Sequence, residues 1–392
     1  MTRAGLGLAA AGVILVAAWL GAPARSPAAA QVPTFEPAGD ATPLERLPGG
    51  ARESRALRLA RDRLADGDDA LVLGIARGHL EAARASGDPR EAGRAQAALA
   101  RWAGDPSPPP DARVLRAAVA QHLHAFDDAI AELDAVLARD PDHLQARWLR
   151  ASVLRAVGRL DASLDDCSVL VERAAGASAS TCVADLRSLR GDRGAARELD
   201  ARLAARPPAA SERGWIDLVR AEIAEREGRD DDALRLHASA RAHGIDGPYA
   251  RVAHADALIA RGRRDAAIAV LDGAPPTDAV EVLRAVALAG AADPRADAVA
   301  RAVRARFAAE DARGGDDGAR HLRERARFAL DVDRDPSAAL ALAERNWARQ
   351  KEPSDARLLL RAARAAGRDA AAAPVRAFVE RHGIADLRLE RR

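Results

Sequence analysis

The sequence has few aromatic residues and few cysteines, and it lacks the short motifs of common enzymes. Phenylalanine, tryptophan and tyrosine make up 3% of its 392 residues, with one tyrosine, and there are two cysteines. A β-sandwich or barrel depends on aromatic and β-branched side chains, so this composition argues against both architectures. No GxSxG, HExxH, CxxC, P-loop or dinucleotide-binding glycine pattern occurs. The sequence therefore predicts no catalytic residue and no cofactor, although a dispersed catalytic set leaves no such motif.

Lysine is nearly absent as well. Lys351 is the only lysine, so arginine supplies nearly all of the 60 basic residues, which face 58 acidic ones. A GC-rich bacterial genome accounts for this bias without any phosphate recognition. If residues 1–30 are removed, Arg3 and Arg25 are lost and the net charge falls from +2 to 0, because 58 basic residues then face 58 acidic ones. A neutral chain has no long-range attraction for nucleic acid or anionic lipid, so we expect neither as a partner.

The residues that are abundant favour helices. Hydrophobic residues make up 48% of the chain and charged residues 30%. Much of the hydrophobic content is alanine, which is the strongest helix former and allows helices to pack closely. The composition therefore predicts an all-α protein.

Two consecutive stretches within residues 110–177 share one pattern at one spacing. In AFDDAIAELDAVLARDP, large and small apolar residues alternate before a proline: Phe126, Ala129, Leu133, Val136 and Pro141. After the turn residue Gly158, the pattern returns as Leu160, Ser163, Cys167 and Leu170, with Leu160 34 residues after Phe126. This order and period resemble the second helix of a tetratricopeptide repeat. The resemblance implies a right-handed superhelical solenoid of about nine stacked antiparallel helix hairpins.

The resemblance extends over residues 73–382. Later hairpins are expected to begin near Ala177, Gly214, Pro248, Asp278, Arg320 and Pro353. Their turn glycines are expected at Gly191, Gly228, Gly262 and Gly367, and small inward residues at Ala196, Ala233, Ala267, Ala298, Ala339 and Ala372. Asp-Pro pairs at residues 88–89, 293–294 and 335–336 predict capped starts of second helices. Residues 310–318 are expected to form an exposed loop.

The first helices depart from the family pattern. In both opening copies, arginines stand where the family has tryptophan and leucine: Arg113, Arg116, Arg147 and Arg150. The apolar face of these helices is expected to come instead from Leu115, Val119, Leu149 and Val153.

The N-terminus has the composition of an export signal. Arg3 precedes an apolar stretch from Ala4 to Leu20, and small residues at 28–30 suit cleavage before Gln31. We expect residues 1–30 to be a cleaved signal peptide and the protein to be exported to the periplasm. The alternative is an uncleaved inner-membrane anchor, with the rest of the chain facing the periplasm.

The rest of the chain divides by composition. Residues 31–50 are rich in proline and glycine and predict a flexible tether. Residues 51–103 predict N-terminal helices with a degenerate repeat, and residues 104–110 a proline-rich connector. Residues 111–383 form the expected repeat array, and residues 384–392 a charged tail.

The two cysteines predict a disulfide. Exported proteins commonly oxidise an even pair of cysteines, here Cys167 and Cys182. On the repeat register, Cys167 lies in a second helix and Cys182 in the first helix of the next hairpin, and these two helices are antiparallel neighbours. The alternative is two small buried thiols that never reach bonding distance.

Neither the acidic runs nor the histidines predict a metal site. Asp331, Asp333 and Asp335 alternate like the start of a calcium loop, but Pro336 and Leu342 stand where glycine and glutamate are needed. We therefore expect Asp335 to cap a helix. His237 and His254 can approach through adjacent helices, but their spacing gives no ligand pattern, and His122 and His124 point to different faces of a helix.

The register of the family places several polar and aromatic residues of first helices on the concave groove. These candidate partner-binding residues are Trp148, Arg155, Asp185, Trp215, Glu222, Tyr249 and Asp256. Aromatic anchors among mixed charges suit an extended peptide or a helix of a partner protein. The alternative is that the rings only fill gaps between helices.

These observations favour a non-catalytic protein-interaction scaffold or adaptor in the bacterial cell envelope. Two alternatives from other classes stay open. One is an envelope hydrolase with a dispersed active site, and the other is a solenoid that binds cell-wall glycan in its groove.

Overall fold

The computed structural model describes residues 68–174, 176–313 and 321–390. The predicted signal peptide, the tether and a helix expected over residues 51–65 lie outside these ranges. Every regular element within them is a helix, as the alanine-rich composition predicts. None of the helices described here is both long enough and apolar enough to cross a membrane.

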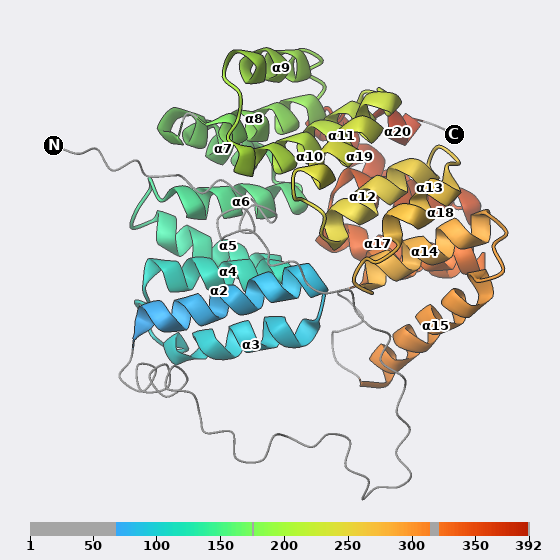
Figure 1. Ribbon diagram of the computed structural model, residues 1–392, viewed down its shortest axis with the longest axis horizontal. Coiled ribbons are helices and arrows are strands. Elements are labelled where there is room, and N and C mark those ends of the chain that lie inside the picture. The colour runs from blue at the N-terminus through green and yellow to red at the C-terminus, as the bar shows by residue number, and fades with distance from the viewer. Residues whose placement is uncertain (1–67, 175, 314–320, 391–392) are drawn as a thin grey trace, which may run out of the picture.

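The described helices form nine antiparallel hairpins (Figure 1). The first four are α2 (Asp69–Ser86) with α3 (Pro89–Leu99), α4 (Pro110–His122) with α5 (Phe126–Leu137), α6 (Leu144–Ala156) with α7 (Leu160–Ala174), and α8 (Ala177–Leu189) with α9 (Ala195–Ala205). The other five are α10 (Ala210–Arg226) with α11 (Asp230–Ala242), α12 (Pro248–Ile259) with α13 (Arg264–Leu271), α14 (Asp278–Gly290) with α15 (Ala296–Arg313), α16 (Leu322–Phe328) with α17 (Pro336–Arg349), and α18 (Pro353–Ala365) with α19 (Ala373–His382). The short helix α20 (Leu387–Glu390) follows.

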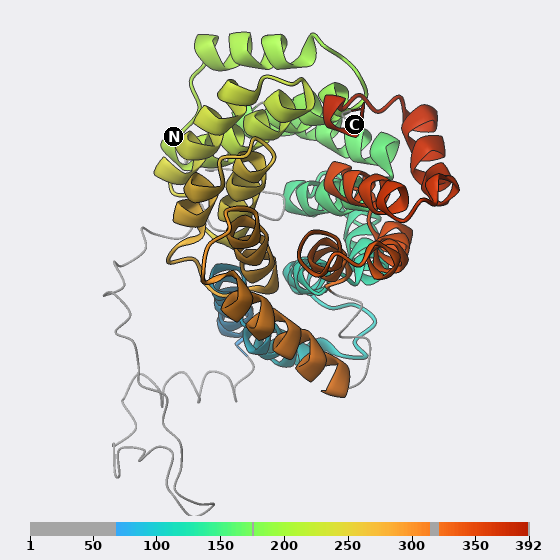
Figure 2. The same ribbon diagram turned by 90° about the vertical axis from the view of Figure 1, so that its right-hand side faces the viewer.

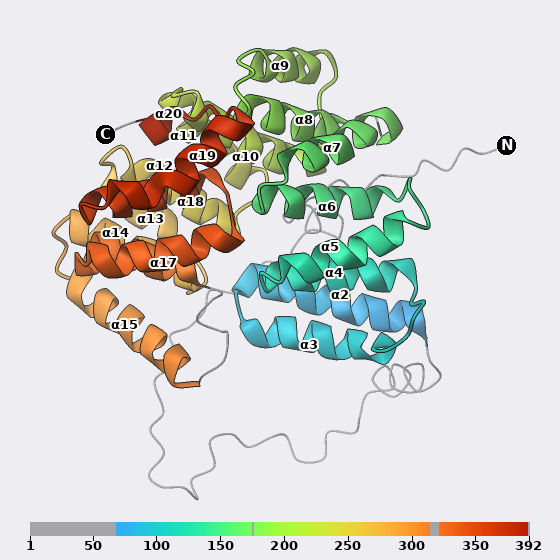
Figure 3. The ribbon, with the colours of Figure 1, turned by 180° about the vertical axis from the view of Figure 1, so that it is seen from behind.

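The hairpins follow a right-handed superhelix. From α2 to α14 they run clockwise in Figure 1, and α17 to α19 lie behind them, as the reverse view in Figure 3 shows. Seen from the side, the helices surround a common interior (Figure 2). The structure therefore confirms the tetratricopeptide-like solenoid and the number of hairpins that the sequence predicts.

The positions that define the repeat are buried as expected. In α5 and α7 the buried residues include Phe126, Ala129, Leu133, Val136, Leu160, Ser163, Cys167 and Leu170. Ser163 satisfies its buried hydroxyl by donating to the carbonyl of Ala151 at 2.7 Å. The replacement apolar face of the first helices is also buried, at Leu115, Val119, Leu149 and Val153.

Ion pairs explain the arginines in the first helices. In the second hairpin, Arg113 and Arg116 both bind Glu132, at 2.8 and 2.6 Å. In the third hairpin, Arg147 and Arg150 both bind the fully buried Asp166, at 2.7 and 2.8 Å. Each of the three residues in the second hairpin has its counterpart 34 residues later in the third hairpin, so the ion pairs recur with the period of the repeat. Each pair joins the two helices of its own hairpin.

Turns and caps also follow the predictions. Gly158, Gly191, Gly228, Gly262 and Gly367 all have positive φ at the turns between helices. The carboxylates of Asp88 and Asp335 accept backbone hydrogen bonds from Arg90 and Ala338 at the starts of α3 and α17. The last long helix ends at the left-handed Gly383, as expected.

Two predictions around α15 are wrong. Ala298 is exposed, and Ala300 and Val303 provide the buried contacts of this helix instead. Residues 310–313 of the expected loop belong to α15, which continues to Arg313, and residues 314–318 lie outside the described residues. Figure 1 shows the far end of α15 extending away from the stack, although Ala300, Val303 and Phe307 pack on α14.

The helix α9 also departs from regular stacking. It packs mainly against α8, and α10 contacts α8 more extensively than it contacts α9. A cavity of about 230 Å³ lies between α7, α8 and α9. Its lining includes Val171, Val183, Leu199, Arg187 and Glu198. The ion pair of Arg187 with Glu198, at 2.7 Å, joins α8 to α9 beside this cavity.

The C-terminal hairpins return to the turns of the early hairpins (Figure 3). The amide of Lys351 donates to the carbonyl of Ala156 at 2.8 Å, and the amide of Ala385 donates to Leu189 at 2.9 Å. Gly158 lies at this junction, against the ring of Phe378 and the side chain of Lys351. The superhelix therefore closes on itself.

A disulfide joins the third hairpin to the fourth. Cys167 in α7 and Cys182 in α8 are bonded, with their Cα atoms 5.7 Å apart. This confirms the pairing that the sequence predicts and links two helices that are already antiparallel neighbours.

The disulfide yields a prediction about stability. It closes a loop of 15 residues, so replacing both cysteines with alanine should lower the free energy of unfolding by about 3 kcal/mol. Urea unfolding measures the change. A reductant should destabilise the wild type and leave the double-alanine variant unchanged. Two free thiols in the denatured, non-reduced protein contradict the bond.

Gly158 yields a second prediction. Its φ is +81°, and the Cβ of any other residue at this position would lie only 2.8 Å from the ring of Phe378. Gly367 also has a positive φ, of +66°, but a Cβ there would have no atom within 4 Å. Both alanine variants incur about 1 kcal/mol for the left-handed backbone. Gly158→Ala should lose about 1 kcal/mol or more beyond Gly367→Ala, measured by urea unfolding. Equal losses mean that the C-terminal hairpins do not pack at this turn.

Candidate functional site

The candidate binding residues lie on first helices, where the register places them. Trp148 and Arg155 lie on α6, Asp185 on α8, Trp215 and Glu222 on α10, and Tyr249 and Asp256 on α12. Two polar members of this set, Arg155 and Asp256, pair with residues of the C-terminal hairpins across the interior that Figure 2 shows. We refer to this surface, Arg155, Asp185, Glu222, Tyr249 and Asp256, as the inner face.

The two tryptophans lie in the interior of the helix layer. Trp148 is 4% exposed and Trp215 is 8% exposed, and their rings meet edge to face with centroids 5.8 Å apart. Leu170, Ala179 and Ile216 pack around them. This placement agrees with the alternative that the rings fill a gap between helices, and it leaves little of either ring for a partner.

Arg155 is the centre of the inner face. Its guanidinium lies 2.7 Å from Asp185, 3.4 Å from Glu222 and 3.6 Å from Glu352. Asp185 is further paired with the buried Arg226, at 2.5 Å. Arg155 therefore joins α6, α8 and α10 to the residue that caps the start of α18.

The network continues on the C-terminal side. Arg323, just inside α16, pairs with Glu352 at 2.5 Å and with the buried Asp355 at 2.6 Å. The side-chain amide of Asn346 donates to Asp355 at 2.7 Å. Glu352 and Asp355, the carboxylates on this side, are thus both paired with Arg323.

Asp256 makes a second bridge across the interior. Arg327 of α16 lies 3.0 Å from its carboxylate, and Arg357 of α18 lies 3.5 Å away. The chain end adds a third bridge, because Arg388 of α20 pairs with both Glu225 of α10 and Asp386. The predicted charged tail is therefore packed against α10 over its described residues.

The inner-face carboxylates differ in how well their charge is compensated. Burial raises the pKa of Asp185, but Arg155 and Arg226 outweigh it and hold that pKa below its ordinary value. For Glu222, burial and the neighbouring Asp185 prevail over Arg155, so its pKa is raised. Glu222 is therefore the carboxylate of this surface that gains most from an added cation.

Tyr249 provides the exposed aromatic surface of the site. It is 50% exposed, and among the described large hydrophobic residues only Leu387, at 39%, is also exposed. Its hydroxyl donates to Glu222 at 2.8 Å. The charge of Glu222 and burial of the hydroxyl raise the pKa of Tyr249 well above its ordinary value, so this hydroxyl stays protonated as a donor.

Two groupings were not predicted as sites. His237 and His254 stack with centroids 5.5 Å apart, and His237 binds Glu225 at 2.6 Å. Burial lowers the pKa of His254 to about 4, and the neighbouring charge of His237 adds to this effect.

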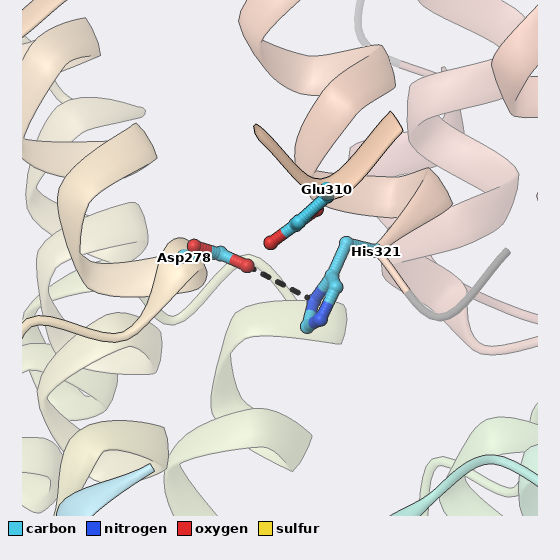
Figure 4. Close-up of side chains that lie close together, drawn as sticks. All are labelled: Asp278, Glu310 and His321. Atoms are coloured by element: carbon cyan, nitrogen blue, oxygen red, sulfur yellow. Dashed lines mark ion pairs between the residues drawn. The ribbon is translucent and has the colours of Figure 1, made fainter. Parts of the chain in front are cut away.

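The second grouping is Asp278, Glu310 and His321, which are close enough to hold a metal ion (Figure 4). Their separation along the chain left no spacing pattern from which to find them.

Comparisons with known proteins find similarity to solved structures. No protein-family model matches the sequence, and no curated protein matches it. A tetratricopeptide repeat protein from Parabacteroides merdae is 16% identical over 59% of this chain and 93% of its own, with a TM-score of 0.39. Human IFIT1, as a dimer with m7Gppp-AAAA, is 14% identical over 86% of each chain, with a TM-score of 0.45. The tetratricopeptide repeat domain of P58(IPK) is 16% identical over 79% of this chain and 97% of its own, with a TM-score of 0.20.

The bridge at Asp256 predicts a pH-dependent stability. Burial raises its pKa, but Arg327 and Arg357 outweigh this and lower it to about 2. Because this lies below the unfolded value of about 3.9, ionised Asp256 stabilises the fold above about pH 4, and the contribution is lost as the pH falls toward 2. Asp256→Asn should lower the free energy of unfolding by about 2 kcal/mol at pH 7.

Thermal unfolding at pH 7, 4, 3 and 2.5 checks this prediction. The difference between wild type and Asp256→Asn should shrink below pH 4. Asp165, exposed on α7, offers a control, and Asp165→Asn should change stability by less than about 0.5 kcal/mol. A difference for Asp256→Asn that stays constant from pH 7 to 2.5 means that its carboxylate carries no such bridge.

Proposed function

We propose that this chain is a non-catalytic scaffold of the bacterial cell envelope that holds a partner protein against its inner face. The observation that carries the proposal is the pairing of a half-exposed ring, Tyr249, with an under-compensated carboxylate, Glu222. In a chain with 3% aromatics, a ring left half in water is an available anchor.

The chemistry of this pair indicates the kind of segment that it accepts. A cation over the tyrosine ring gains a cation–π contact, and the same cation within reach of Glu222 gains an ion pair. An arginine or lysine on a peptide or helix of the partner meets both conditions. The remaining carboxylates of the inner face, Asp185 and Asp256, are already paired with arginines. A basic residue of the partner therefore gains less from an ion pair with either of them.

The fold supports a scaffold because stacked hairpins present a continuous surface of first helices. The envelope location rests on the predicted export signal over residues 1–30 and on the disulfide, which suits an oxidising compartment. The partner is a protein, and neither a cofactor nor a nucleic acid is part of the proposal.

Site-specific photo-crosslinking in intact cells tests the proposal. A photoreactive residue at position 249 should capture a defined partner, whereas one at position 165, exposed on the second helix α7, should not. With the purified partner, Tyr249→Ala should weaken binding by about tenfold, because it removes the ring. Tyr249→Phe should retain most of the affinity, because it keeps the ring and loses only the hydroxyl.

Glu222→Gln separates the charge from the ring. It should weaken binding and reduce the dependence of affinity on salt, because it removes the ion pair with the basic residue. Circular dichroism shows whether each variant keeps its helix content. The proposal fails if position 165 captures the same proteins as position 249, or if both Tyr249→Ala and Glu222→Gln leave the affinity unchanged.

A further inference from the structure

Three ligand-type side chains from three different elements converge beside α15. Asp278 is the first residue of α14, Glu310 lies near the end of α15, and His321 directly precedes α16. Figure 4 shows the three side chains turned toward one another across the space between these helices. None of them belongs to the inner face.

The distances suit a single metal ion. One ligand atom from each residue can be chosen so that all of them lie within 4.8 Å of one another. Tetrahedral coordination with bonds of about 2.0 Å places ligand atoms about 3.3 Å apart. The imidazole Nδ1 of His321 and the carboxylate of Asp278 are already 3.4 Å apart. The remaining separations need to close by about 1.5 Å at most, which side-chain rotation provides.

The buried carboxylate of Asp278 has an ion-pair partner but no aligned hydrogen bond on one of its oxygens. The residue is 8% exposed, and its Oδ1 accepts no hydrogen bond. Arg306 lies 2.7 Å from this oxygen, but its N–H group is not aligned with it. A buried carboxylate oxygen without a hydrogen bond is costly, and a bound cation removes that cost.

Two arginines lie beside the carboxylates of this group. Glu310 is paired with Arg325 at 3.0 Å, and Asp278 has Arg306 beside it. The two arginines balance the two carboxylates when no metal is bound, and Arg306 competes with a cation for Asp278. The arginine is exposed over 43% of its side chain, so it can turn into solvent when a cation binds.

We propose that Asp278, Glu310 and His321 bind one divalent cation of the zinc class, with a fourth position left to water. A set of one imidazole and two carboxylates suits zinc, whereas calcium and magnesium prefer oxygen ligands alone. Such an ion joins the starts of α14 and α16 to the far end of α15. It thereby fixes the helix that otherwise extends from the stack.

Calorimetric titration of the full-length, metal-stripped protein with zinc chloride tests the site. The wild type should bind one zinc ion with micromolar affinity or tighter. His321→Ala should weaken binding at least about tenfold, because it removes the nitrogen ligand. His79 offers a matched control, since it is also partly exposed and lies 2.6 Å from a carboxylate, that of Glu91. His79→Ala should bind zinc like the wild type.

Arg306→Gln keeps the test independent of damage to the fold. It removes the competing cation and leaves all three ligands in place, so it should strengthen zinc binding several-fold. The proposal is overturned by a wild type that takes up no zinc, by binding that His321→Ala leaves unchanged, or by binding that His79→Ala weakens as much as His321→Ala does. Weaker binding in Arg306→Gln with native helix content also overturns it.

Discussion

The contact between the end of α17 and the turn after α6 determines the shape of this molecule. A solenoid in which each hairpin touches only its neighbours is quasi-one-dimensional, and its stability is a sum of local terms. Here Lys351 binds the backbone of Ala156, and Arg349 reaches the backbone of His124, 225 positions away. These contacts couple distant hairpins, so loss of one hairpin in the C-terminal third affects the early ones. They also place the last two hairpins where an open groove would offer space to a partner.

Arginine serves two structural purposes in this chain. Within the second and third hairpins, pairs of arginines on the first helix bind one carboxylate on the second helix, in place of the large apolar side chains of the family pattern. Across the interior, Arg155, Arg327 and Arg388 form ion pairs between the C-terminal hairpins and earlier ones. A planar guanidinium can bind two or three acceptors at once, which lysine cannot match geometrically. Buried ion pairs add little net stability. We therefore infer that these networks align the C-terminal hairpins with the earlier ones, and that they contribute less to the free energy of unfolding.

Local pattern was sufficient to predict the hairpins, their caps and the cysteine pair, because each depends on residues of one helix or of two consecutive helices. Phe126 and Leu160 occupy matching buried positions, and Asp335 caps α17 as its sequence indicates. The prediction for Ala298 failed because α15 packs through Ala300 and Val303, a register that the regular repeat does not give. The closure of the superhelix and the group of Asp278, Glu310 and His321 depend on contacts between remote segments. No periodicity within the sequence records such contacts.

The inner face shows why position on the correct helix does not by itself define a binding surface. Trp148, Trp215 and Tyr249 all lie on first helices at comparable register, but the tryptophans meet each other inside the layer, where α6 and α10 enclose them with Leu170 and Ile216. Tyr249 stands at the start of α12, has Glu222 as its hydrogen-bond partner, and keeps half of its surface in water. Exposure of a large ring is unfavourable unless a second surface covers it. The ring of Tyr249 therefore narrows the candidate surface from a whole groove to one end of α12 and the adjacent turn of α10.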